Sequence, residues 1–399
     1  MGMRPAPVPT PLRGARAAGL REGAWAVMAL VVAGCAATGP PRPSATTGHQ
    51  VTGAGHVARA SSAAAARLPA AAGVEVPPGF RAQVYARGLV RPTAMAIGPG
   101  GRLFVAEASG AVVAVPEGSR RPVRFAVGFP SPRGLAWVGR TLYVSARGEV
   151  DRVRLAHGRP TVRRRLVGGL PHGLHQQDAI VPGPGGRLYV GSGSTCNACR
   201  EPDPYAASVL SLLPSGRDLT AVATGLDNAA GLAVQPRTGR LYAAVDGRLR
   251  LGSAADPEPA DMLVRILPGG WYGWPGCWPD ARLLVMRGAC RGVTTPAAFL
   301  GPHAGVAGIA FYTGRSFPPG YRGNLFVAEW GLAHSAAGPG RRVVRIVLGR
   351  DGTAPISDVS VFALGLQHPV AVAVDPRGAL LLLDGGRGIV YRIQADGTP

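Results

Sequence analysis

The chain has 399 residues and a formal net charge of +21, and it contains no lysine, so its 43 basic residues are all arginine. These arginines are scattered along the sequence, without an arginine-rich helix and without aromatic residues between them, which argues against nucleic-acid binding. A GC-rich genome that encodes arginine in place of lysine explains the excess more simply, although weak attraction to an anionic membrane surface would follow from it.

A basic segment and a short apolar run open the chain. Three arginines between positions 13 and 21 precede residues 24–34, AWAVMALVVAG. A run of this length is too short to span a bilayer and is typical of an export signal, so residues 1–34 are predicted to be a signal peptide. The small residues before Cys35 resemble a bacterial lipobox, which implies lipidation of Cys35 and anchoring to the outer face of the cell membrane, or a periplasmic location. An ordinary signal peptide with a chance cysteine is the alternative.

The next segment, residues 35–75, is rich in Ala, Gly, Pro, Ser and Thr and shows no strand alternation. This composition predicts a flexible tether. The rest of the chain, residues 76–399, carries the repeats described next and is predicted to form one domain.

One pattern recurs six times: an apolar strand, a turn with Pro and Gly, and a second strand that begins Gly-Arg-Leu-Tyr-Val or a near copy. Repeats of short strands about 40 to 75 residues apart are typical of β-propeller blades. One blade cannot bury both faces of its sheet, whereas six arranged radially can. We therefore predict an all-β, six-bladed β-propeller, with a β-sandwich as the alternative. The copies cover residues 94–106, 134–145, 178–191, 231–245, 308–331 and 371–384.

Polar residues precede the inner strand of each predicted blade. The inner strands of a propeller begin at the same end of the channel, so these residues should converge on one mouth although they are far apart in sequence. Three of the eight histidines fall at this position, and histidine suits proton transfer near neutral pH. The residues are Arg91 and Pro92, Pro132 and Arg133, His175 to Gln177, Asp227 and Asn228, His303 to Gly305, and Gln367 and His368.

Four cysteines remain besides Cys35, in two pairs that are close in sequence. An exported chain meets an oxidising compartment, so we predict the disulfides Cys196–Cys199 and Cys277–Cys290. The Cys-x-x-Cys pair could instead be redox-active or half of a zinc site, but no second Cys-x-x-Cys motif follows it.

Several stretches resemble the pyrroloquinoline quinone (PQQ)-dependent glucose/sorbosone dehydrogenases over residues 76–395. They are His175 before an inner strand with SGSTCNAC after its partner strand, GLDN at 225–228, GGWYGWPGC at 269–277, the segment 303–331 and the segment 368–384. The Cys-Asn-Ala-Cys loop is more similar to the sorbosone branch.

The resemblance implies PQQ across the channel mouth, Ca²⁺ bound to the quinone, and oxidation of a small sugar, alcohol or aldehyde by hydride transfer. His175 matches the base that takes the hydroxyl proton. The positions implied for the cofactor are Gln176, Asp227, Asn228, His303 and His368. The positions implied for the metal are Asp246, Asp256, Glu258 and Asp261.

The sequence departs from the family pattern at several positions. Asp227 and His368 stand where arginines are usual, and the family's cofactor-binding lysine has no counterpart. An aspartate facing the three carboxylates of PQQ weakens binding, so Ca²⁺ or another arginine, such as Arg91, Arg133 or Arg200, must compensate. Two alternatives follow: a propeller at the cell surface that binds a ligand or partner without redox chemistry, and a metal-dependent lactone hydrolase.

Overall fold

The computed structural model describes residues 68–115, 121–248, 258–331 and 340–397. The chain divides into two units, Met1–Ser62 and Ala63–Pro399, and everything below concerns the second. The predicted signal peptide, Cys35 and most of the predicted tether therefore lie outside the described residues. Within the described part, no helix is long and apolar enough to cross a membrane.

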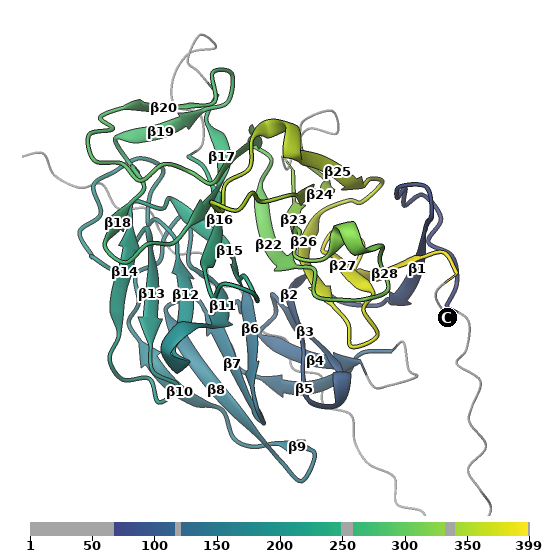
Figure 1. Cartoon of the computed structure of the whole chain (residues 1–399). Helices are drawn as coiled ribbons and strands as arrows, with labels where there is room; N and C mark the ends of the chain where they lie inside the picture. The colour runs from purple at the N-terminus through teal and green to yellow at the C-terminus, as the bar shows by residue number, and fades with distance from the viewer. Residues whose placement is uncertain (1–67, 116–120, 249–257, 332–339, 398–399) are drawn as a thin grey trace, which may run out of the picture. The chain divides into compact units, whose positions relative to one another are not determined.

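The described residues form six small sheets, antiparallel apart from one short added strand, which are drawn around a common centre in Figure 1, and a separate two-stranded hairpin. The strands of the first three blades are, in chain order, β2 (Pro92–Ile97), β3 (Leu103–Glu107), β4 (Ala111–Val115) and β5 (Val123–Val127); β6 (Gly134–Val138), β7 (Thr141–Ala146), β8 (Glu149–Ala156), β9 (Arg159–Pro160) and β10 (Arg164–Gly168); and β11 (Gln177–Pro182), β12 (Leu188–Ser192), β13 (Ser208–Leu212), β14 (Thr220–Thr224) and β18 (Gly270–Trp271).

The other three blades have the same order from the inside outward. Their strands are β15 (Asn228–Val234), β16 (Leu241–Asp246), β17 (Ala260–Arg265) and β21 (Ala298–Pro302); β22 (Val306–Phe311), β23 (Leu325–Glu329), β24 (Arg342–Ile346) and β25 (Val359–Ala363); and β26 (Pro369–Val374), β27 (Leu380–Asp384), β28 (Ile389–Ala395) and β1 (Phe80–Ala86). An extra hairpin of β19 (Cys277–Asp280) and β20 (Val285–Gly288) is inserted between β17 and β21.

The Pro-Gly turns of the repeat have a local cause. In blades 1 and 3 the sequence Pro-Gly-Gly forms a single 3₁₀ turn between the inner and second strands, with Gly100 and Gly185 at φ +71° and +68°. Residues with a Cβ rarely adopt these angles, so glycine allows the tight reversal.

The hydrophobic core is divided among the blades. The described residues form six clusters of buried apolar side chains, and each cluster joins two neighbouring blades: 1 with 2, 2 with 3, and so on to 6 with 1. The middle strands β3 and β27 are buried on both faces. This division explains how a chain too long for a single core folds, and it confirms the six-bladed propeller over the sandwich.

Blade 6 closes the ring with the first strand of the unit. Strand β1 pairs antiparallel with β28, with Phe80 opposite Ala395 and Ala86 opposite Val390. Upstream of β1, Ala70 and Glu75 form β-bridges to Gln83 and Leu364. The last residues of the segment predicted to be a tether therefore already contact the propeller.

Candidate active site

A cavity of about 630 Å³ lies where the six inner strands begin, and every blade contributes to its wall. Strands β2, β6, β11, β15, β22 and β26 each contact the next around the ring (Figure 1). The structure therefore brings together the residues before the inner strands, as the repeats predict. Those that line the cavity include Arg91, Pro92, Ser131, Arg133, His175, Asn228, Gly305 and His368.

Buried carboxylates at the strand ends hold the loops that carry this wall. Glu107, the last residue of β3, accepts a hydrogen bond from the backbone N–H of Val90 at 2.8 Å. Asp384, the last residue of β27, accepts from the N–H groups of Gln367 and His368 at 2.8 and 3.0 Å. Each acid satisfies backbone donors that the loop cannot pair itself, so it fixes where the wall residues stand.

The same loops contain strained backbone. Arg91, Ser131 and His303 have φ values of +46°, +45° and +48° and precede the inner strands of blades 1, 2 and 5. Non-glycine residues rarely adopt such angles, and they are found most often at functional sites.

His175 lies on the cavity wall, and two backbone hydrogen bonds hold its segment. Its N–H donates to Ser194 O at 3.0 Å, and the N–H of Leu174 donates to Thr195 O at 2.9 Å. Burial, together with the nearby Arg133 guanidinium, lowers the pKa of the His175 imidazole to about 4. The ring is therefore neutral at neutral pH and able to accept a proton.

A group of buried acids lies beside His175. Asp178 lines the cavity, and its carboxylate is 3.6 Å from the half-exposed guanidinium of Arg133. Burial raises the pKa of Asp178 to about 6, although Arg133 and a hydrogen bond from Asn228 favour its charged form. Asp246 also lines the cavity, and burial followed by the charges of Asp227 and Asp178 raises its pKa to about 7. The cavity wall thus carries two carboxylates, Asp178 and Asp246, and two guanidinium groups, Arg91 and Arg133.

Asn228 occupies the middle of this group. Its side chain is among the hydrogen-bonding partners of both Asp178 and Asp246, whereas its buried Oδ1 has no hydrogen-bond partner. A buried acceptor without a donor is costly unless a ligand or cation satisfies it.

Asp227 and Gln176 are buried behind the wall and do not line the cavity. Asp227 is 3% exposed, and its Oδ1 accepts from the Ser194 hydroxyl at 2.6 Å. Gln176 donates from Nε2 to Ser131 O at 2.8 Å, which ties blade 3 to the loop before β6. Burial raises the pKa of Asp227 to about 7, against the hydrogen bond from Ser194.

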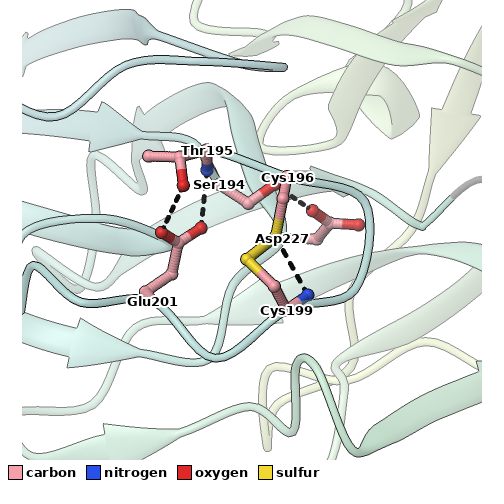
Figure 2. The surroundings of a disulfide bond; sticks show 6 residues. All are labelled: Ser194, Thr195, Cys196, Cys199, Glu201 and Asp227. Atoms are coloured by element: carbon pink, nitrogen blue, oxygen red, sulfur yellow. Dashed lines mark hydrogen bonds between the residues drawn. A yellow bond between two sulfur atoms is a disulfide. The ribbon is translucent and has the colours of Figure 1, made fainter. Parts of the chain in front are cut away.

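The Cys196–Cys199 disulfide lies in the loop 193–207, whose Ser194 and Thr195 accept hydrogen bonds from the His175 segment. Ser194 of the same loop also donates to Asp227, as Figure 2 shows. Within this loop Glu201 accepts hydrogen bonds from the N–H of Thr195 at 2.5 Å and from its hydroxyl at 2.6 Å. The Ser194 N–H donates to Asp227 O at 2.7 Å. The second disulfide, Cys277–Cys290, joins the two ends of the β19–β20 hairpin. Both predicted pairings are confirmed.

The predicted metal ligands do not converge as one set. Asp246 and Asp261 are neighbours, but Glu258 is exposed and Asp256 lies outside the described residues. Asp261 does not line the cavity and is occupied by backbone donors, the N–H groups of Gly247 at 2.9 Å and Val306 at 3.1 Å. Among the described residues, the one triad of possible metal ligands is Cys196, Cys199 and Glu201, whose cysteines are disulfide-bonded.

An aromatic pair forms another part of the wall. The indole of Trp330, which follows β23, stacks on the His368 imidazole with ring centroids 4.1 Å apart. His368 Nδ1 also lies 3.0 Å from Trp330 O. His303, by contrast, is not among the residues that line the cavity.

The fold and this site define a class: a six-bladed β-propeller with one polar cavity at the start of its inner strands. The model of the Glucose / Sorbosone dehydrogenase family matches residues 215–392, which confirms the resemblance inferred from the sequence. A search of the curated proteins gave no match.

Solved structures agree with this assignment. An oxidoreductase from Thermus thermophilus, described as a glucose dehydrogenase, is 26% identical, with a TM-score of 0.62 over 79% of this chain and 100% of that one. The PQQ domain of pyranose dehydrogenase from Coprinopsis cinerea is 17% identical, with a TM-score of 0.68 over 80% and 97%. The PQQ-bound aldose sugar dehydrogenase from Streptomyces coelicolor is 22% identical, with a TM-score of 0.61 over 82% and 99%. The last two show the shared fold.

Proposed function

We propose that this protein oxidises a sugar or a related alcohol or aldehyde in the cavity at the mouth of the propeller. The observation that carries the proposal is the neutral, partly buried imidazole of His175 on the wall of a cavity built by all six blades. The family match and the sugar dehydrogenases among the similar structures support the same reaction class.

The residues of the cavity fit PQQ and Ca²⁺. Arg91 and Arg133 line the wall and are the cations available to the three carboxylates of PQQ, in place of the arginines missing at Asp227 and His368. Arg133 is shared with Asp178, whose carboxylate lies 3.6 Å away. The carboxylates of Asp178 and Asp246 and the unpaired Oδ1 of Asn228 are hard oxygen donors, which Ca²⁺ prefers. When bound, the quinone would supply the acceptor for the hydride, which carries both electrons of the oxidation.

His175 performs the proton transfer in this proposal. As the carbon of the substrate loses a hydride, its hydroxyl must lose a proton, and neutral His175 accepts that proton. The disulfide loop holds the His175 backbone, while the Arg133 charge opposes premature protonation of the ring. The Trp330–His368 pair offers a flat apolar surface on which the carbon face of a sugar ring can rest.

Titration of the purified protein with PQQ and Ca²⁺, followed by absorbance and by dye reduction with a panel of aldoses, tests the proposal. We expect saturable PQQ binding that requires Ca²⁺ and sugar-dependent dye reduction. Absence of PQQ binding at high Ca²⁺ would refute the proposal and leave the non-redox binding propeller as the better account.

We also propose that the chain is exported and acylated at Cys35. The two disulfides of the propeller fit an oxidising compartment. The native protein should partition into detergent, and Cys35→Ala should release it or block its processing. Mass spectrometry that finds a mature N-terminus beyond Cys35 without an acyl mass contradicts this.

A further inference from the structure

In each blade an arginine stands shortly before the second strand, at the end of the blade that is far from the cavity. The inner strands begin at the cavity, so the turn that follows each of them lies at the opposite end of the blade. We call the surface formed by these six turns the back face; it comprises residues 98–102, 139–140, 183–187, 235–240, 312–324 and 375–379. The arginines are Arg102, Arg140, Arg187, Arg240, Arg322 and Arg377.

The turns of different blades contact one another and form one surface. A shallow hollow is lined by Ile97 of blade 1, Thr313 and Arg315 of blade 5, and Asp375 and Arg377 of blade 6. On the other side of the ring, Arg240 of blade 4 donates to Asp351 O, from the β24–β25 loop of blade 5, at 3.3 Å. The repeat therefore distributes its arginines over one end of the propeller.

Acids occupy the opposite end of the same strands. In four blades the second strand has an arginine before it at the back face and ends near the cavity in a carboxylate that is buried or, for Asp246, half-buried. These pairs are Arg102 and Glu107, Arg240 and Asp246, Arg322 and Glu329, and Arg377 and Asp384. The repeat therefore places an arginine before one end of these strands and an acid at the other end.

The back face itself holds one acid, Asp375, and others, including Asp218, Asp351 and Asp358, lie in the loops beside it. Asp218 and Asp375 are paired with Arg187 and Arg392. Asp351 accepts hydrogen bonds from Thr353. Within the described residues, four exposed back-face arginines have no ion pair and no hydrogen bond through the side chain: Arg102, Arg237, Arg315 and Arg322.

We propose that the back face docks on an anionic phospholipid membrane. Guanidinium groups bind phosphate oxygens strongly, and arginines dispersed over all six blades match a plane of headgroups better than a compact acidic ligand. Of the three aromatic rings of these turns, Tyr312 and Phe317 are buried in the core, and Tyr321 packs edge-on against Phe317 with the Arg345 guanidinium over its ring, so they offer no open platform for nucleic-acid bases. Docking in this orientation leaves the cavity facing away from the membrane and open to substrate.

Flotation of the full chain with vesicles tests the proposal, with Cys35→Ala present throughout to remove any acyl contribution. We expect binding to vesicles of phosphatidylcholine and phosphatidylglycerol in equal amounts, little binding to phosphatidylcholine alone, and weakening with added salt. Changing Arg102, Arg237 and Arg322 together to Gln should lower the affinity roughly 100-fold, because each basic residue near an anionic surface contributes about fivefold. The same three changes to Lys should retain most of the binding.

The matched control removes three exposed arginines elsewhere. Arg87 and Arg147 lie at the cavity end of their blades, and Arg291 follows Cys290 of the β19–β20 disulfide. Changing these three to Gln lowers the net charge equally and should change the affinity by less than about threefold. Equal losses in the two triple variants would show that net charge alone governs binding and would overturn the proposal. The proposal would also be overturned if the back-face triple Gln variant lost affinity for duplex DNA but kept its affinity for the vesicles.

Discussion

At the scale of single residues, the environment of His175 decides when it can act as a base. A histidine with an ordinary pKa of about 6.5 is half protonated at that pH. Burial and Arg133 lower the pKa of His175 to about 4, so its ring is neutral across the whole range above that value.

The first prediction follows from this shift. The acid limb of kcat/KM should fall near pH 4 rather than near pH 6.5 in the holoenzyme. His175→Ala should lower turnover by about 10²- to 10⁴-fold, the usual contribution of a positioned base, with PQQ binding largely kept. His172→Gln, an exposed histidine outside the cavity, is the control. Turnover that survives in His175→Ala would assign proton transfer to another group.

The second prediction concerns an ion-pair network remote from the cavity. Arg163 contacts both Glu149 and Asp151, with Nε 3.0 Å from the Asp151 carboxylate. Asp151 is fully buried, and burial raises its pKa to about 6 against the attraction of Arg163. Because this folded-state pKa lies above the unfolded value, the contribution of Asp151 to stability is present below about pH 4 and is lost as the pH rises through 6.

Arg163→Gln should therefore destabilise the fold by about 3–5 kcal/mol at pH 8, since buried Asp151 loses its partner and Glu149 keeps only Arg165. The loss should be smaller at pH 5, where Asp151 is largely protonated. Arg164→Gln, which changes an exposed neighbour without an ion pair, should have almost no effect. Urea denaturation at the two pH values measures the difference; equal losses at both would contradict the role given to Asp151.

Sequence reasoning identified some site residues and missed others for a geometric reason. The repeats place His175, Asn228 and His368 at equivalent positions, and all three line the cavity. Neighbouring residues of an extended segment point to opposite sides, so Asp227 lies behind the wall while Asn228 faces the cavity. Asp178 was missed because it lies inside an inner strand. A charged residue in an otherwise apolar strand could have indicated that its side chain faces the cavity.

At the scale of elements, the two disulfides have different neighbours. The loop that contains Cys196–Cys199 is hydrogen-bonded through Ser194 and Thr195 to the His175 segment, and through Ser194 to Asp227, the contact that Figure 2 shows. Cys277–Cys290 instead links the ends of a hairpin that is inserted outside the four-stranded pattern of the blades. Their spacing in sequence predicts both bonds, but only the folded loops show which of them supports the cavity.

The third prediction compares the two bonds. Cys277→Ser with Cys290→Ser should lower the free energy of unfolding by about 2–4 kcal/mol, because the bond closes a longer loop, and should leave turnover nearly unchanged. Cys196→Ser with Cys199→Ser should cost less stability but lower turnover more, because the loop that holds His175 is released. Thermal unfolding and dye reduction on both double variants measure the two effects; the opposite ranking of turnover would refute the positioning role of the Cys196–Cys199 loop.

At the scale of the whole propeller, the sequence repeats predict six blades and their order, but they do not show how the ring closes. The repeat pattern begins at residue 94, and β1 precedes it without a repeat signature. The structure pairs β1 with β28, so the first and last strands of the unit share blade 6. Closure therefore depends on contacts between segments more than 300 residues apart in the chain, such as Arg81 and Asp396.

The fourth prediction tests this closure at Phe80, the first residue of β1. Its ring contacts those of Phe317, Tyr321 and Phe362, with centroids 4.7, 5.2 and 5.4 Å away. Phe80→Ala removes apolar burial and three aromatic contacts at once, so we expect a loss of about 2–4 kcal/mol in the free energy of unfolding. Val162→Ala, at a side chain that is 90% exposed, should cost almost nothing. Because blade 6 would open first, hydrogen exchange should rise earliest in β1 and β28; uniform exchange across all blades would show that this closure is not the weakest point of the ring.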